Sequence, residues 1–143
     1  MPSPRKYLVP VDFSKGSEAA LSHAIGLARE DKARLILMHV IPAAMVYPRE
    51  STNFDFYALL ARDARENIAR LAKRHKLKPG DYRLVLLRGV DTADVIARQA
   101  RKLRVSMIVM GSHGRTGLQR LLMGSVAERT LRYARCPVLI VKK

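Results

Sequence analysis

The sequence lacks several features that would assign it to a specialised class of protein. It contains one cysteine, Cys136, which excludes an internal disulfide and suits a reducing compartment. No apolar run approaches the roughly 18 residues that a membrane-spanning helix needs. The N-terminal Met-Pro-Ser-Pro-Arg-Lys is followed only by a short apolar stretch that ends at Asp12, so no signal segment is expected. These absences predict a soluble, cytoplasmic protein.

Acidic residues are scarce. The chain has 12 Asp and Glu against 27 Lys and Arg, a formal net charge of +15. So basic a protein attracts polyanions, including nucleotides and nucleic acids. The basic residues are nevertheless spread along the chain, and aromatic residues do not alternate with them as in a base-stacking surface. We therefore favour a solvated basic surface and keep a module that binds nucleic acid or polyphosphate as an alternative.

The sequence also lacks the common catalytic and phosphate-binding patterns. Neither G-x-x-x-x-G-K-[ST] nor G-x-G-x-x-G is present. No pair of carboxylates and no cluster of metal ligands stands at a catalytic spacing. Phosphoryl transfer needs a positioned metal and an oriented nucleophile. An efficient enzyme is therefore not expected.

Short apolar runs alternate with helical patterns along the whole chain. The expected strands are 5–11, 35–41, 82–87, 107–110 and 137–141. The expected helices begin at Ser14 or Ser17, span about 55–76, begin at Asp91 or Thr92, and span 125–135. This alternation predicts an α/β fold with one doubly wound, five-stranded parallel sheet and helices on both faces. The length of 143 residues predicts a single domain, 1–143.

Helical spacing also predicts which side chains face the core. In the second helix these are Phe56, Leu60, Ala64, Ile68 and Leu71, and in the last helix Ala127, Thr130, Leu131 and Ala134. His39 lies inside an apolar strand. A lone histidine in such a run is more often a satisfied core residue than a ligand, so no chemistry is assigned to it.

The segment after the fourth strand has the parts of an anion-binding site. The strand ends at Gly111, Gly114 and Gly117 follow, and Gly124-Ser125 opens a helix. Glycines allow a backbone to approach a phosphate closely, and a helix N-terminus favours negative charge. Arg115 and Arg120 add positive charge. The alternative is a surface loop whose glycines serve turns. Ser125 is also ambiguous, because with Glu128 it forms a capping-box pattern.

This segment resembles the nucleotide-binding signature of the universal stress protein (UspA-like) family. Gly111-x2-Gly114-x9-Gly124-Ser125 matches the family pattern G-x2-G-x9-G-[ST] at every fixed position. Three further stretches are similar to the family: Leu8-Val-Pro-Val-Asp-Phe-Ser14, Leu37-Met-His-Val40 and Cys136-Pro-Val-Leu-Ile-Val141. The resemblance covers nearly the whole chain, in order.

The resemblance implies a Rossmann-like, adenine nucleotide alpha hydrolase-like fold with strand order 3-2-1-4-5. Strands 1 and 4 would then lie side by side where the winding direction reverses. Ligands of open α/β sheets bind at such a switch point, beyond the carboxyl ends of the strands. The turn that holds Asp12 and the loop that holds Gly111 would therefore line one crevice.

The resemblance also implies a ligand, ATP with Mg²⁺, and its contacts. The expected binding residues are Pro10, Val11, Asp12, Val40, Met110, Gly111, His113, Gly114, Arg115, Gly124, Ser125 and Val126. Asp12 would bond the ribose or base, or hold Mg²⁺ through water; its alternative role is a carboxylate at a helix start. Val40 would flank the adenine or serve only as core. No protein group is expected to ligate a metal directly.

The function implied is that of an ATP-binding sensor or regulator in the stress response, with at most slow ATP hydrolysis. The apolar last strand, Pro137–Val141, is an edge strand in the implied order, and exposed edges are normally paired or covered. The family pairs this strand across a two-fold axis, so a homodimer is expected. A dimeric stress protein without a nucleotide remains a further alternative.

Overall fold

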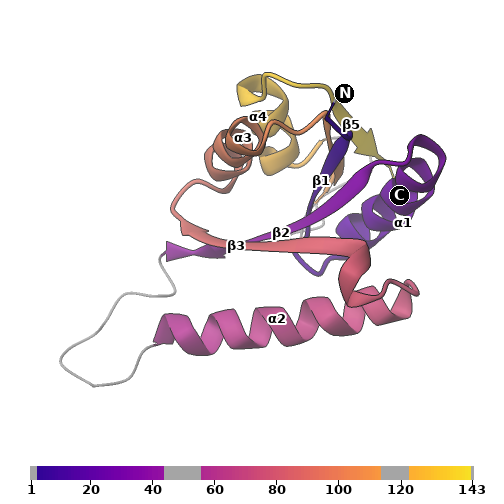
Figure 1. Ribbon diagram of the computed structural model, residues 1–143. Coiled ribbons are helices and arrows are strands. Elements are labelled where there is room, and N and C mark those ends of the chain that lie inside the picture. The colour runs from indigo at the N-terminus through magenta and orange to yellow at the C-terminus, as the bar shows by residue number, and fades with distance from the viewer. Residues whose placement is uncertain (1–2, 44–55, 114–122, 143) are drawn as a thin grey trace.

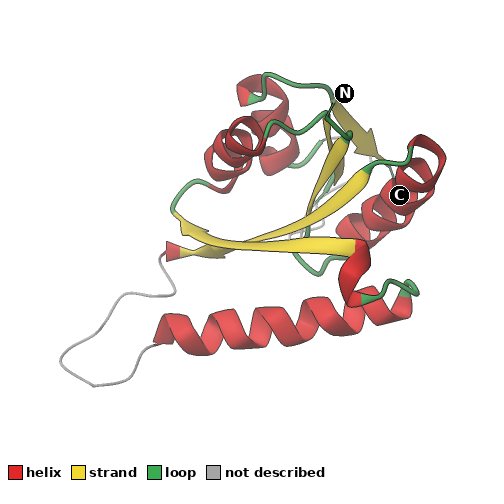
Figure 2. Ribbon diagram, viewed as in Figure 1, coloured by secondary structure: helices red, strands yellow, loops and turns green. Residues whose placement is uncertain are grey.

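The computed structural model describes residues 3–43, 56–113 and 123–142, in which strands and helices alternate (Figures 1 and 2). The strands are β1 (Lys6–Pro10), β2 (Arg34–Pro42), β3 (Tyr82–Gly89), β4 (Met107–Gly111) and β5 (Val138–Val141). The helices are α1 (Lys15–Asp31), α2 (Phe56–Arg74), the short 3₁₀ helix η2 (Pro79–Asp81), α3 (Thr92–Leu103) and α4 (Ser125–Tyr133). No helix in these ranges is both long enough and apolar enough to span a bilayer.

The strands form one parallel sheet in the order β3-β2-β1-β4-β5, which confirms the expected fold. β1 lies in the middle, paired with β2 from Lys6↔Arg34 to Pro10↔Met38 and with β4 at Tyr7↔Met107. The direction of winding reverses between β1 and β4. The carboxyl ends of both strands therefore open onto a common crevice.

The pleat of the sheet divides the core into two layers. Tyr7, Val9 and Val109 point to the face covered by α1 and α2, whereas Leu8 and Ile108 point to the face covered by α3 and α4. Figure 1 shows α2 on one side of the sheet and α3 and α4 on the other. Both faces of the central strands are buried, as the continuous apolar runs predict.

Side-chain caps fix where two helices begin. Ser14 is the N-cap of α1, and its hydroxyl accepts a hydrogen bond from the Ser17 N–H at 3.1 Å. Asp91 is the N-cap of α3 and accepts from the Asp94 N–H. In each case the sequence left two candidates, and the first of the two is the cap.

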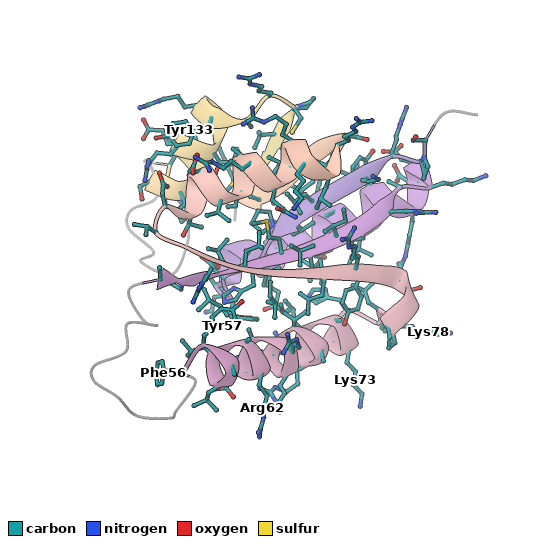
Figure 3. All side chains as sticks on the ribbon, turned by 60° about the vertical axis from the view of Figure 1, so that its left-hand side comes forward. Phe56, Tyr57, Arg62, Lys73, Lys78 and Tyr133 are labelled. Carbon is teal, nitrogen blue, oxygen red and sulfur yellow. The ribbon has the colours of Figure 1, made fainter. Side chains whose placement is uncertain are left out.

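Three local predictions are wrong. The N-cap of α4 is Gly124, without a side-chain cap, so Ser125 and Glu128 form no capping box. Leu131 is 41% exposed, because it lies on the side of α4 turned away from the core, whereas Ala127 and Thr130 are buried. Phe56 is 45% exposed, since it is the first residue of α2 and its ring lies beyond the end of that helix (Figure 3).

Candidate functional site

A cavity of about 650 Å³ lies at the carboxyl ends of β1, β2 and β4. It contains most of the residues that the sequence predicted for a binding site: Pro10, Val11, Asp12, Val40, Met110, Gly111, His113, Gly124, Ser125 and Val126. Gly114 and Arg115, the other two predicted residues, lie outside the described residues. Segments that are far apart in the sequence therefore form the wall of one cavity.

The turn after β1 holds Asp12 at the start of α1. One oxygen of its carboxylate, Oδ1, accepts hydrogen bonds from the Ser14 N–H, at 3.0 Å, and from the Ser14 hydroxyl. The Asp12 N–H donates to Ser17 Oγ at 3.3 Å. These bonds fit the role of a helix-start carboxylate. Within the described chain, Oδ2 accepts no hydrogen bond, so that role leaves one carboxylate oxygen available to a ligand.

β2 extends beyond β1 at the cavity. The Val11 N–H donates to the Met38 carbonyl at 2.7 Å, after the ladder between β1 and β2 ends at Pro10↔Met38. Backbone groups alternate between the two sides of a strand, so the N–H and C=O of Val40 point to the same side as the Met38 carbonyl. They therefore face the crevice beyond the end of β1. The Val40 side chain is buried, so this residue also belongs to the core.

His39 is satisfied, as expected, but it also lines the cavity. Its Nδ1 lies 2.6 Å from the Val11 carbonyl oxygen, to which the ring nitrogen donates. Its ring centroid lies 4.9 Å from that of Phe13, which has a left-handed backbone with φ of 65°. His39 and Phe13 thus form one wall, and the sequence analysis assigned neither to the site.

At the end of β4, the backbone packs directly against the first turn of α1. A Cβ atom on Gly111 would lie 2.7 Å from the carbonyl carbon and oxygen of Gly16. A Cβ atom on Gly16 would lie 2.5 Å from the carbonyl oxygen of His113. Real Cβ atoms do not approach backbone atoms so closely, so both positions require glycine. Gly111 therefore has a packing role, whether or not a ligand approaches it.

Helix α4 points its N-terminus into the cavity. The first intrahelical bond is donated by the Glu128 N–H to the Gly124 carbonyl at 3.0 Å, so the N–H groups of Ser125, Val126 and Ala127 precede it. The Gly124 N–H instead donates to the Ser112 carbonyl at 2.6 Å, which ties the helix start to β4. The exposed Ser125 is the first helical residue, and its hydroxyl is not used as a cap. This arrangement suits an anion.

Helix α2 supplies a wall that the sequence analysis missed. Asp63 and Asn67, one turn apart, line the cavity beside Leu60 and Ala64. Both apolar residues were assigned to the core. A polar pair flanking that stripe at a spacing of four residues was the available signal, but only the packed structure shows that this part of α2 borders the cavity.

The charge of the cavity differs from that of the whole protein. Among its described lining residues the formally charged side chains are Asp12 and Asp63, and none is Lys or Arg. The described walls are therefore acidic, although the net charge of the whole protein is +15. The described residues also contain no group of three or more His, Cys, Asp or Glu side chains that would hold a metal ion.

Comparison with known proteins identifies the family. The sequence profile of the universal stress protein family matches residues 4–142. The chain is 36% identical over 141 residues to universal stress protein MJ0531 of Methanocaldococcus jannaschii, covering 97% of this chain and 82% of that protein. The protein described here belongs to the universal stress protein family.

Solved structures agree with this assignment. The structure of MJ0577, a universal stress protein of the same archaeon, has a TM-score of 0.82 at 29% identity and covers 97% of this chain and 96% of that one. A universal stress protein in complex with cAMP has a TM-score of 0.65 at 23% identity and covers 98% of both chains. At that identity the second similarity bears on the fold alone.

Proposed function

We propose that this protein binds an adenine nucleotide, ATP with Mg²⁺, in the cavity beyond β1 and β4, and acts in the cytoplasm as a sensor or regulator of the stress response. One observation carries the proposal. Residues predicted from three separate sequence motifs line a single cavity at the switch point of the sheet. Open α/β sheets bind ligands at this position.

The two ends of the cavity suit the two ends of the nucleotide. At the β2 end, the backbone of Val40 offers a donor and an acceptor to adenine, and Pro10 and Val11 offer apolar contact. At the β4 end, the N–H groups at the start of α4 suit the phosphates. Asp12 lies between them, where its carboxylate reaches the ribose or a water of hydrated Mg²⁺. A universal stress protein solved with cAMP shows that the family includes a nucleotide binder.

We propose binding rather than efficient catalysis. A phosphoryl-transfer site needs an oriented nucleophile and a firmly held metal. The described walls offer two carboxylates, Asp12 on the turn after β1 and Asp63 on α2, and no lysine. These groups are consistent with slow ATP hydrolysis at most. The protein would then act through the conformation that it adopts when the nucleotide is bound.

A substitution at Gly124 tests the site. Val in place of Gly124 places a branched side chain at the start of α4, where the phosphates are proposed to lie. The extended backbone of Gly124, with φ of −62°, accepts Val without strain. We expect at least a tenfold loss of ATP affinity by calorimetry, with a melting temperature only slightly lowered, because Val is a poorer N-cap than Gly.

The matched control for this substitution is Gly80→Val. Gly80 lies in η2, away from the cavity, and a Cβ atom there meets nothing within 4 Å. The control should bind ATP like the unsubstituted protein. Equal ATP affinity in the Gly124→Val variant and the control would show that the nucleotide does not use the α4 N-terminus.

We also propose that two copies pair through β5. This strand contacts β4 on one side and is the outer strand of the sheet, and all four of its residues, Val138–Val141, are partly exposed. Pairing with a second copy would cover this apolar edge. Light scattering after size-exclusion chromatography should give twice the chain mass of 16.1 kDa. A mass of one chain at micromolar concentration would contradict the proposal.

A further inference from the structure

The amino end of the sheet, opposite the cavity, carries basic side chains at the starts of neighbouring strands. Lys6 begins β1 and is paired with Arg34, the first residue of β2. Arg83 is the second residue of β3, the next strand along. Arg104 follows α3 and lies just before Ser106, whose N–H donates to the Lys6 carbonyl at 2.8 Å. We call these four residues, Lys6, Arg34, Arg83 and Arg104, the basic row.

The strand residues of the basic row point to the same face of the sheet, the one covered by α3 and α4. Leu8 and Ile36 belong to the core layer on that face. Side chains alternate along a strand, so Lys6 and Arg34, each two residues earlier, point the same way. Arg83 is paired with Ile36 and therefore points there as well. Neighbouring strands lie about 4.8 Å apart, so a row across the starts of four strands is about 14 Å long.

The arginines of the basic row are exposed and unneutralised. The ion pairs formed by the described residues include none of Arg34, Arg83 and Arg104, which are all exposed. Two carboxylates also lie at this end of the sheet. Asp31, however, is engaged on the α1 side, and Asp81 accepts from the backbone N–H that precedes η2. Like charges held side by side repel, so an anionic partner would relieve a cost that the fold carries here.

Helix ends account for only part of the basic row. The carboxyl end of a helix has partial negative charge and attracts cations. Lys6 Nζ donates to the Leu103 carbonyl of α3 at 2.9 Å, and Arg104 is the C-cap of the same helix. Arg34 and Arg83 lie on β2 and β3, so this explanation does not extend to them.

The length and chemistry of the row fit a nucleic-acid backbone. One strand of a duplex has a phosphate about every 3.4 Å along the axis, so a row of about 14 Å faces about four phosphates. Guanidinium groups bind phosphate oxygens in pairs. The exposed large apolar side chains of the described chain lie on α2, after β3, and at or along α4, and none belongs to the row. Stacking of single-stranded bases and insertion into a bilayer both need such side chains, so a duplex is favoured.

We propose that the basic row binds the phosphate backbone of a double-stranded nucleic acid, without base preference. The row lies at the amino ends of the strands and the nucleotide cavity at their carboxyl ends, so this inference does not rest on the proposed function. Each phosphate contact releases counterions, so a plot of log K against log salt has a slope of about −0.9 per contact. Four contacts predict a slope of about −3.6.

Removing the three arginines tests the row. The variant Arg34→Gln/Arg83→Gln/Arg104→Gln should bind a short labelled DNA duplex at least tenfold more weakly, because three phosphate contacts are lost. Its salt slope should fall to about −0.9. Fluorescence anisotropy over a series of KCl concentrations measures both quantities. Melting temperatures check that the variant folds, and Arg83→Gln alone should lower the slope by about 0.9.

A charge-matched control removes three arginines that lie elsewhere and pair with an acidic residue of their own helix. It is Arg62→Gln/Arg98→Gln/Arg132→Gln. Both triple variants lower the net charge from +15 to +12. The control should bind the duplex within a few-fold of the unsubstituted protein. Both variants should bind Mg²⁺-ATP as the unsubstituted protein does, so the two sites can be judged separately.

Three outcomes would overturn the inference. The first is an equal loss of duplex affinity in the row variant and in the control, which would mean that binding follows net charge alone. The second is no binding of duplex DNA or duplex RNA at low salt; titrations with each distinguish the two sources of such a backbone. The third is binding to polyglutamate or to phosphatidylglycerol vesicles that is as tight as binding to a duplex.

Discussion

At the scale of single residues, the site depends on a close crossing of two backbones. The first turn of α1 and the end of β4 meet at Gly16 and Gly111, with no room for a Cβ atom on either. This contact aligns the turn that carries Asp12 with the loop that carries His113. The geometry of the cavity is thus set by backbone packing before any side chain contacts a ligand.

Replacing Gly16 by Ala should therefore destabilise the protein. The new Cβ atom would meet the His113 carbonyl oxygen at 2.5 Å, and two backbone segments would have to separate. We expect a loss of about 1–3 kcal/mol in the free energy of unfolding, the usual cost of overpacking, measured by urea denaturation.

Gly26→Ala, in the same helix, is the control. Gly26 meets nothing within 4 Å, so Ala there should stabilise by up to about 1 kcal/mol through helix propensity. If both substitutions stabilise the protein, the close crossing of α1 and β4 is not a constraint on the fold.

The sequence predicted the residues of the glycine motif but not this crossing. The spacing of Gly111 and Gly124 is a local pattern that can be matched to a family. The requirement for glycine at position 16 depends on a carbonyl group of His113, far along the chain, so no local pattern reveals it. For the same reason the buried Nε2 of His113, which has no hydrogen-bond partner among the described residues, becomes visible only in the folded structure.

At the scale of elements, a charged cluster ties α1 to the end of α2. Glu18, in the first turn of α1, accepts from Arg74 Nη2 at 3.1 Å and lies 3.1 Å from Nε2 of His75. Burial raises the pKa of Glu18, but hydrogen bonds and positive charge from Arg74 and His75 outweigh it, so the net pKa lies below the ordinary value of 4.5. Both helices line the cavity.

Glu18 should make the stability of the protein depend on pH. A carboxylate whose pKa is lowered in the folded state stabilises that state above its unfolded pKa, and the contribution is lost as pH falls through the folded pKa. Glu18→Gln should thus lower the free energy of unfolding at pH 7, by no more than about 1 kcal/mol for so exposed a pair. The difference should shrink below pH 4.5.

Urea denaturation at pH 7 and pH 3 measures this difference. Glu66→Gln controls for the removal of one negative charge, because Glu66 pairs only with Arg62 of the same helix, at 3.5 Å, among the described residues. If Glu18→Gln lowers the free energy of unfolding by the same amount at both pH values, packing and not the charge of Glu18 stabilises the cluster.

The order and type of the elements could be predicted because each carries its own periodicity and turn residues. The residue at which α4 begins could not be predicted in this way. Ser125 and Glu128 have the spacing of a capping box, but the Ser112 carbonyl binds the Gly124 N–H and makes Gly124 the last residue before the helix. A tertiary hydrogen bond thus overrides a local signal and leaves the Ser125 hydroxyl outside a cap.

At the scale of the whole molecule, the described basic side chains lie outside the described walls of the candidate site. Basic side chains cover the helix surfaces; Arg62 and Lys73, for example, point from α2 away from the sheet (Figure 3). The described walls of the cavity contain no Lys or Arg. Binding to the basic surface and binding in the cavity should therefore respond differently to salt, since exposed charges are screened and a buried hydrogen-bonding site much less so.

This separation also shows the limit of prediction from sequence at the largest scale. The composition determines the net charge, but it does not show where the charged side chains lie in the fold. The wall built by Asp63 and Asn67 could not be foreseen, because it depends on how α2 packs beside the cavity.

The most direct test of the central claim is a calorimetric titration of the protein with Mg²⁺-ATP, GTP and inorganic tripolyphosphate at moderate and high salt. If the cavity is an adenosine site, ATP should bind selectively, with a Kd near micromolar and a binding free energy of about −8 kcal/mol. This binding should persist at high salt. Equal binding of all three ligands that fades with salt would contradict it, and would mean that the basic surface alone binds polyanions.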